Sequence, residues 1–250
     1  MQCFYTCRPM ATLPPASNPS WRDALSKWLR VMPRRSALGA LSKPGPDRHQ
    51  ETYDAEYYEF IEYTAVYSQN PMADSIVRDL APRTVLDLGC GTGALLEALR
   101  KRKVRRRKVR VAGLEYSDAA LTYCKKRRLS VRKFDIARHD LPRKLRRRDV
   151  ALSFEVAEHL APELADRFVE TLTAASDTVV FSAATPGQGG TDHVNEQPHE
   201  YWIDKMHALG FRLDEDLTRR WRDEWRGCTA NWYHMNVMVF HHGAYCLKAA

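Results

Sequence analysis

Acidic residues and histidines stand at spacings that would let their side chains share one site. Asp87, Glu115 and Asp135 each lie at the end of a short apolar segment that predicts a β-strand. In an open α/β sheet, ligands bind outside the carboxyl ends of the strands, so we expect these carboxylates to face one crevice. Asp87 would suit a cationic amine, Glu115 the two hydroxyls of a ribose, and Asp135 an adenine amino group.

A second group follows the next predicted strand, in the segment Glu155-Val156-Ala157-Glu158-His159. If this segment begins a helix, Glu155, Glu158 and His159 are at positions i, i+3 and i+4 and share one face. Two carboxylates and an imidazole can hold a divalent cation, and the dominance of oxygen ligands favours Mg²⁺ or Mn²⁺ over zinc. In the alternative without a metal, Glu155 lies near the bound ligand and His159 forms local hydrogen bonds.

His193 lies in a glycine-rich polar loop that follows the fifth predicted strand. Such loops carry functional residues, and histidine ordinarily titrates near neutral pH, so His193 and His159 are the candidate catalytic residues. His193 is equally a candidate for an additional metal ligand or a solvated loop side chain. The aromatic side chains of Trp221, Trp225 and Trp232 either wall an acceptor pocket or pack in the core.

The segment Asp87-Leu88-Gly89-Cys90-Gly91-Thr92-Gly93 joins an apolar strand to a helix through three glycines. Glycine is needed where the backbone turns tightly and approaches a ligand closely. Gly89-x-Gly91-x-x-Ala94 also satisfies the looser dinucleotide-binding pattern. Dinucleotide folds usually keep an apolar residue at the position of Asp87, so the acid favours a ligand with a cationic amino-acid group.

Strands and helices alternate along the chain. Helices are predicted over residues 53–67, 72–80, 94–100, 119–127, 161–174 and 200–209, and strands over 84–88, 110–115, 131–135, 149–154 and 178–182. The alternating pattern of residues 231–240 predicts a closing strand that runs antiparallel to its neighbours. This order indicates a doubly wound α/β fold with helices on both faces of a mostly parallel sheet.

The sequence V-L-D-L-G-C-G-T-G-A-L-L resembles motif I of the class I S-adenosylmethionine-dependent methyltransferases, and the resemblance extends over about residues 53–240. It implies a seven-stranded Rossmann-like sheet and S-adenosyl-L-methionine as the cofactor. The cofactor-binding residues that we expect from the resemblance and the spacing are Asp87, Gly89, Gly91, Gly93, Glu115, Asp135 and Glu155.

The segment E-V-A-E-H is similar to the E-V-x-E-H of ubiquinone-pathway O-methyltransferases, for which the family implies a Mg²⁺ role. It also resembles the metal-binding cluster of Hen-type small-RNA 2′-O-methyltransferases, which add a downstream histidine, here His193. The loop P-G-Q-G-G-x-x-H-V-N-E-Q is similar to one in a broad set of bacterial methyltransferases.

These resemblances imply transfer of a methyl group from S-adenosylmethionine to an oxygen of a small-molecule acceptor, with or without Mg²⁺. A metal-dependent RNA 2′-O-methyltransferase and a non-catalytic cofactor-binding module are the alternatives. A nicotinamide oxidoreductase would leave Asp87 and the cluster of Glu155, Glu158 and His159 without a role.

The positive charge is concentrated: residues 100–148 hold 21 Lys and Arg against four Asp and Glu. Each basic run precedes a predicted strand, on the edge of the sheet opposite the crevice, and the runs have almost no aromatic residues for base stacking. Solvated loops are therefore the favoured interpretation, with docking on RNA or another anionic surface as the alternative.

The chain of 250 residues has room for one substantial domain and an extension. Residues 1–50 predict a proline-rich, largely disordered leader with an amphipathic helix near Trp21, and residues 51–250 a methyltransferase domain. No apolar run is long enough to span a membrane, and the six scattered cysteines favour a cytoplasmic protein. Nothing in the sequence sets the oligomeric state.

Overall fold

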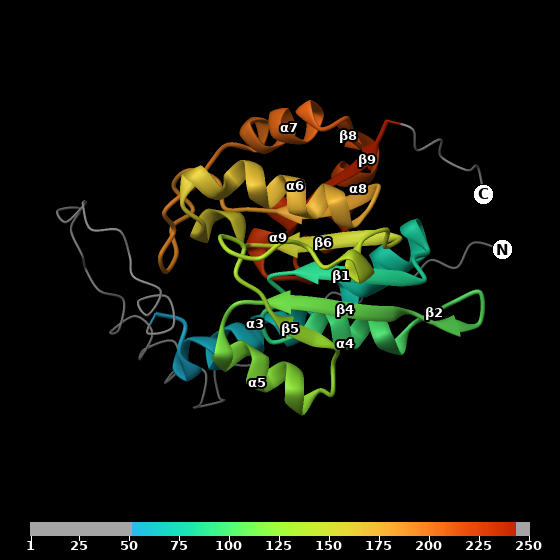
Figure 1. The fold of residues 1–250 in the computed structure, drawn as a ribbon. Helices are drawn as coiled ribbons and strands as arrows, with labels where there is room; N and C mark the ends of the chain where they lie inside the picture. Colours follow the sequence, from blue (N-terminus) through green and yellow to red (C-terminus); the bar gives the residue numbers. More distant parts are fainter. Residues whose placement is uncertain (1–51, 244–250) are drawn as a thin grey trace.

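The computed structural model describes residues 52–243, and Figure 1 shows their arrangement. The leader expected over residues 1–50 lies outside the described residues. No helix in the described range is both long and apolar enough to span a lipid bilayer.

The core of the fold is a seven-stranded sheet in the order β5-β4-β1-β6-β7-β9-β8. Its strands are β1 (Thr84–Leu88), β4 (Arg110–Glu115), β5 (Val131–Lys133), β6 (Val150–Phe154), β7 (Thr178–Ser182), β8 (Phe211–Leu213) and β9 (Met238–His242). Neighbours from β5 to β7 pair in parallel, and β9 pairs antiparallel with both β7 and β8. The predicted fold class is therefore confirmed, although β8 was missed and β5 ends two residues earlier than expected.

Helices cover both faces of this sheet (Figure 1). They are α3 (Ala55–Leu80), α4 (Ala94–Lys101), α5 (Asp118–Lys126), α6 (Ala165–Ala175), α7 (His199–Ala208), α8 (Glu215–Trp225) and α9 (Asn231–Asn236). Apolar side chains of α6 and α7 form one core cluster with the sheet, and those of α3, α4 and α8 form a second cluster with it. The doubly wound layering follows from these two separate cores.

The prediction of two helices over residues 53–67 and 72–80 was wrong, because α3 is continuous through Pro71. Proline removes one helical hydrogen bond and costs about 3 kcal/mol in a helix interior. The turn after Pro71 buries Met72, Ala73 and Ile76, each at most 2% exposed. This burial offsets the cost of the proline and keeps the helix whole.

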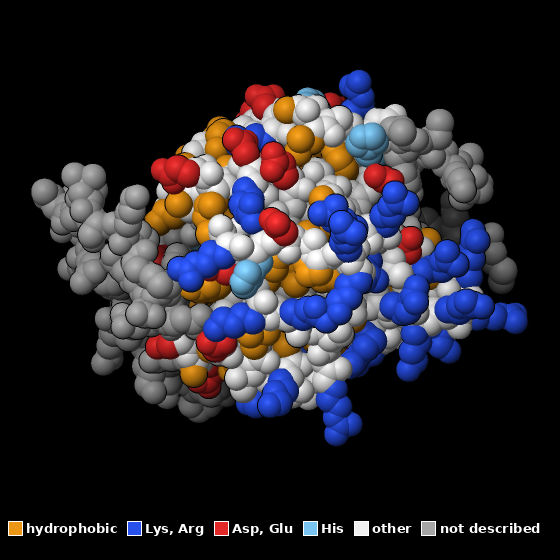
Figure 2. All heavy atoms as spheres, in the orientation of Figure 1, with side chains coloured by type: hydrophobic (Ala, Val, Ile, Leu, Met, Phe, Trp, Pro, Cys, Tyr) orange, Lys and Arg blue, Asp and Glu red, His pale blue; other side chains and the backbone are white. Residues whose placement is uncertain are grey.

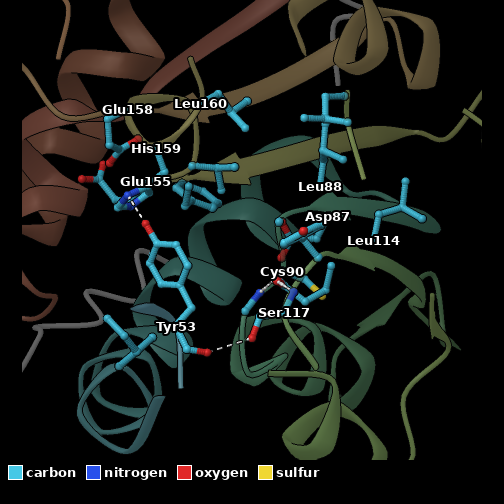
Figure 3. A pocket seen from close by; sticks show the side chains of 18 of the residues that line it. Tyr53, Asp87, Leu88, Cys90, Leu114, Ser117, Glu155, Glu158, His159 and Leu160 are labelled. Atoms are coloured by element: carbon cyan, nitrogen blue, oxygen red, sulfur yellow. Dashed lines mark hydrogen bonds between the residues drawn. The ribbon is translucent and has the colours of Figure 1, made fainter. Parts of the chain in front are cut away.

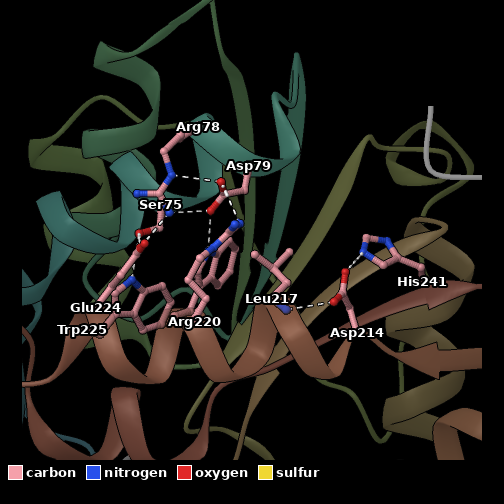
Figure 4. Close-up of polar contacts among 10 residues, drawn as sticks. Ser75, Arg78, Asp79, Asp214, Leu217, Arg220, Glu224, Trp225 and His241 are labelled. Atoms are coloured by element: carbon pink, nitrogen blue, oxygen red, sulfur yellow. Dashed lines mark hydrogen bonds and ion pairs between the residues drawn. The ribbon is translucent and has the colours of Figure 1, made fainter. Parts of the chain in front are cut away.

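The prediction of one strand over residues 231–240 was also wrong, because α9 occupies most of that segment and β9 begins only at Met238. α8 had not been predicted at all. Its Trp221 and Trp225 are fully buried, and their indole N–H groups donate to Asp79 and Ser75 of α3 (Figure 4). These two tryptophans therefore belong to the core, not to the wall of a pocket.

A short antiparallel hairpin interrupts the connection between α4 and β4. It consists of β2 (Lys103–Val104) and β3 (Arg107–Lys108), joined by Arg105 and Arg106. The interpretation favoured from the sequence for this basic run was a solvated loop. The hairpin lies at the edge of the sheet where the parallel strands begin (Figure 1).

Candidate functional site

A cavity of about 1310 Å³ opens at the carboxyl ends of β1, β4, β5 and β6. Pockets for single ligands commonly measure about 300–1,000 Å³, so this one has room for two molecules side by side. Its lining includes the predicted site residues Asp87, Gly89, Gly91, Glu115, Asp135, Glu155, Glu158, His159 and His193. The structure thus brings these residues to one place, and Figure 3 shows part of the lining.

The glycine loop forms the floor of one half of the cavity. Gly89 has a φ of 76°, and a Cβ on it would lie 2.5 Å from a methyl carbon of Val156. Gly91 has a φ of 51° and would point a Cβ into open space. Gly93 is the N-cap of α4, also with a left-handed φ. Of these three glycines, Gly91 is the one with space for the close approach of a ligand, whereas Gly93, which we expected to bind the cofactor, is buried against Leu129 and is not part of the cavity lining.

Glu115 lies against this loop. Its carboxylate accepts hydrogen bonds of 2.8 Å from the backbone N–H groups of Gly91 and Ser117. Burial raises the pKa of Glu115, and these backbone donors partly oppose the rise. The carboxylate is therefore fixed between the loop and the start of α5.

Asp87, at the end of β1, is only 4% exposed and makes no hydrogen bond or ion pair with the described residues. Burial, with a smaller contribution from the Glu115 charge, raises its pKa to about 8. A cation placed beside this carboxyl would favour its ionised form. Asp87 is thus a buried carboxyl to which a ligand could supply a cationic partner.

Asp135 lies two residues beyond the end of β5, at the rim of the same half of the cavity. One carboxylate oxygen accepts from the backbone N–H of Ala137 at 2.9 Å, and the other is 3.4 Å from the Arg138 guanidinium. The carboxylate is half-buried and remains available at the cavity wall.

The opposite half of the cavity begins where β6 ends. The expected α-helix is absent there: Glu155 has a left-handed φ of 53°, and only a single 3-10 turn follows, over Ala157–His159. Glu155 accepts hydrogen bonds from the side-chain amides of Gln188 and Asn236, at 3.0 and 3.2 Å. Its carboxylate is therefore held by amides.

Glu158 is completely buried, and its carboxyl lies beside that of Glu155, without a hydrogen bond of standard geometry among the described residues. Burial, and then the neighbouring Glu155 charge, raise the pKa of Glu158 well above its ordinary value. An unpaired buried carboxylate is costly, so native proteins usually supply such a group with a cation or a proton.

His159 and His193 lie beside Glu158, with their ring centroids 4.9 Å apart. One ligand atom from each of the three residues can be chosen so that all lie within 4.8 Å of one another. The Nδ1 of His159 is 2.8 Å from the Tyr53 hydroxyl, and the Nδ1 of His193 is 2.8 Å from a Glu196 carboxylate oxygen. In a histidine whose Nδ1 is held by such a hydrogen bond, Nε2 is the atom that acts as a metal ligand or as a base.

The group that the structure assembles therefore differs from the metal-binding set expected from the sequence. It contains Glu158, His159 and His193, while Glu155 is engaged by Gln188 and Asn236. Glu155 remains beside Glu158, and the physical reason for the difference is that its oxygens already accept hydrogen bonds from the two side-chain amides.

Sequence reasoning missed several residues that hold this site together. They are Tyr53, Ser117, Gln188, Glu196 and Asn236. The aromatic-rich segment from Tyr53 and the glycine-rich loop were both noticed, and they contain three of these residues. Trp232 lines the cavity, which agrees with the interpretation that it walls an acceptor pocket.

The fold and the cavity define a doubly wound α/β protein with a ligand site at the carboxyl edge of its sheet. Residues 85–176 match the family described as "Methyltransferase domain". A comparison with curated proteins gives no match.

Three solved structures of low sequence identity illustrate the shared fold. PigF with SAH has a TM-score of 0.55 and 16% identity, and the match covers 90% of this chain and 69% of that one. The methyltransferase domain of a bacterial protein, CtHen1-C, has a TM-score of 0.52 and 20% identity, covering 72% and 100%. Magnesium protoporphyrin IX methyltransferase (ChlM) from Synechocystis PCC 6803 with bound SAM has a TM-score of 0.52 and 14% identity, covering 82% and 100%.

The comparisons thus give a methyltransferase-domain match over residues 85–176 and a fold shared with these solved structures.

Proposed function

We propose that this protein transfers the methyl group of S-adenosylmethionine to an oxygen of a small-molecule acceptor, with a divalent cation held by Glu158, His159 and His193. The observation that carries the proposal is the placement of two unsatisfied carboxyl groups in one cavity. Asp87 lies at the glycine loop, and Glu158 lies beside the two histidines.

The residues of the first half fit the cofactor. The Asp87 carboxyl would bind the α-amine of the methionine moiety, and Glu115, held at the loop by Gly91 N–H, would face the ribose hydroxyls. Asp135 would accept from the adenine amino group at the rim. Bound S-adenosylmethionine supplies an electrophilic methyl group on a sulfonium, and the protein then needs chiefly to position the acceptor and remove its proton.

The residues of the second half fit a divalent cation. The buried carboxyl of Glu158 lies beside the two imidazoles, and Tyr53 and Glu196 would orient those rings from outside, as partners of metal-bound histidines usually do. A bound cation lowers the pKa of an acceptor hydroxyl and fixes its oxygen. One carboxylate with two imidazoles suits Mn²⁺ at least as well as the expected Mg²⁺.

The charge of the cavity supports a small acceptor over the alternative of RNA. The lining has six acidic side chains, and Arg138 is the one Arg or Lys among its described residues: the acids are Asp87, Glu115, Asp135, Glu155, Glu158 and Glu163. The lining thus offers a single cationic side chain to pair with phosphate oxygens, and Arg138 is already within 3.4 Å of the Asp135 carboxylate, so the cavity is poorly suited to a chain of phosphates.

Calorimetric titration tests the cofactor. We expect S-adenosylmethionine and S-adenosylhomocysteine to bind and NAD to give no heat of binding. Absence of binding by the folded protein to either adenosyl compound would overturn the proposal. Binding with no acceptor found would favour the non-catalytic module.

Transfer of label from methyl-labelled cofactor to a library of hydroxylated small molecules tests the chemistry. Removal of metal with EDTA and the change Glu158→Gln should each lower turnover at least tenfold, and Mn²⁺ or Mg²⁺ should restore only the wild type. Glu170→Gln, on the exposed side of α6, is the matched control. Turnover that is unchanged in both conditions would remove the metal from the proposal.

A further inference from the structure

The basic segments of the sequence come together on one side of the molecule. The hairpin β2–β3 carries Lys103, Arg105, Arg106, Arg107 and Lys108, all exposed, and Arg110 follows at the start of β4. Figure 2 shows Lys and Arg side chains gathered over this side with few acidic side chains among them. We call these residues, with those of the next paragraph, the basic edge.

The connection from β5 to β6 contributes the rest of the basic edge. Its regular structure is a short 3-10 turn, Arg143–Leu145. Leu141 and Leu145 pack in the core with the sheet, and the basic residues around Leu145 face solvent. The exposed basic residues of this connection are Arg143, Lys144, Arg146 and Arg147. Because β4, β1 and β6 are consecutive in the sheet, their amino ends lie within about 10 Å of one another, and the hairpin and the connection form one surface.

The charges of the basic edge are not neutralised by the protein. None of its ten residues has an ion pair with another described residue, whereas Arg219 of α8 pairs with Asp216, and Arg226, directly after α8, pairs with Asp223. Asp149, which directly precedes β6, accepts through one carboxylate oxygen from the backbone N–H groups of Arg83 and Thr84 at 2.8 Å. A surface of this kind attracts a polyanion.

The backbone at the tip of the hairpin is strained. Arg105 and Arg106 have φ values of 47° and 68°. A two-residue turn with both φ values positive is the type I′ turn, which strongly prefers Asn-Gly. Each arginine in this conformation costs on the order of 1 kcal/mol, so the sequence keeps two guanidinium groups at the tip at the expense of stability.

From this charge, this shape and this strain we propose that the basic edge docks the protein on double-stranded DNA, with the hairpin in the major groove. The groove of B-form DNA is about 12 Å wide and accepts a two-stranded β-ribbon, whereas the major groove of an RNA duplex is too narrow and deep. Arginine outnumbers lysine in the basic edge, and its planar fork matches phosphate oxygens. The lack of aromatic residues fits a duplex, whose bases remain stacked.

Docking at this edge leaves the catalytic cavity free, because the cavity lies at the opposite ends of the same strands. The DNA is therefore an anchor and not the methyl acceptor. This inference does not depend on the acceptor or on the metal.

Fluorescence anisotropy of a labelled 20-base-pair DNA duplex, titrated with the full chain at several KCl concentrations, tests the inference. We expect micromolar affinity at low salt and a logarithmic salt slope of about −0.9 for each phosphate contacted. A 20-base-pair RNA duplex should bind several-fold more weakly. Equal or tighter binding of the RNA, or binding only to vesicles of anionic lipid, would overturn the assignment to DNA.

The double variant Arg105→Asn/Arg106→Gly removes the tip charges and installs the preferred turn. We expect its melting temperature to rise and its DNA affinity to fall at least about tenfold, since two phosphate contacts are lost. The control Arg219→Gln/Arg226→Gln removes the same net charge from paired arginines and should change affinity less than twofold. An equal loss in both variants would show that only net charge matters and would refute the docking surface.

Discussion

The change Asp87→Asn should stabilise the ligand-free fold while weakening cofactor binding. The Asp87 carboxyl is 4% exposed and without a partner, and its pKa rises from 3.8 to about 8. In the unfolded chain the same carboxyl loses its proton near pH 4. Between these two values the folded state therefore holds a proton that the unfolded state has released.

The sign and size of the effect follow from this difference. Because the folded state binds more protons, the free energy of unfolding falls as the pH rises from about 4 to about 8, by roughly 1.4 kcal/mol for each pH unit. A neutral carboxyl and an asparagine amide have similar polarity, so the two proteins should be about equally stable at pH 4. At pH 7 the variant should be more stable by on the order of 2–4 kcal/mol.

Urea unfolding of wild type and variant at pH 4 to 9, each with and without S-adenosylmethionine, measures this. The cofactor should stabilise the wild type and have little effect on the variant, because the amide cannot form an ion pair with the ligand amine. Asp140→Asn is the control, since Asp140 is 89% exposed in its side chain. A stability difference that does not grow with pH, or cofactor binding that survives the change, would refute the reasoning.

Four further changes test the site. Gly89→Ala should abolish cofactor binding and lower the melting temperature, because the added Cβ would overlap Val156. Gly91→Ala has open space around the added Cβ and should cost only about 1 kcal/mol of stability, which thermal melting would measure. Tyr53→Phe should weaken metal binding about tenfold in a calorimetric titration while the cofactor affinity stays the same. Glu196→Gln should weaken metal binding about 10–100-fold, a larger effect because the Glu196 carboxylate also accepts from two backbone N–H groups of the loop. Unchanged metal affinity in the Tyr53 and Glu196 variants would exclude an orienting role for these residues.

The sequence predicted the parts of the fold that have local signals. The strand β1 and its glycine loop are readable because a buried strand is a continuous apolar run and the tight turn needs glycine. Proline disfavours a helix interior, yet α3 continues through Pro71, because the packing of Met72 and Ile76 outweighs the missing hydrogen bond. The prediction of two separate helices was wrong for this reason. The alternation in residues 231–240 fits a strand as well as it fits the short helix that is present.

The site was predictable only as a set of acids at strand ends. Which of them approach one another depends on backbone conformation, as the left-handed φ of Glu155 shows. The contacts that orient the histidines join positions far apart in the chain, such as Tyr53 and His159, and no spacing rule reports them. The basic edge was expected to be a set of solvated loops, because the hairpin that groups its charges has no sequence signal apart from charge.

Tyr53, two residues before the start of α3, is connected to both halves of the cavity. Its carbonyl oxygen accepts from the hydroxyl of Ser117, whose N–H holds Glu115, and its own hydroxyl meets His159 (Figure 3). A ligand that tightens one half therefore lowers the entropic cost of ordering the other, and the benefit is reciprocal. Cofactor and acceptor are then expected to bind cooperatively, and the sequence in which they arrive would govern the steady-state kinetics.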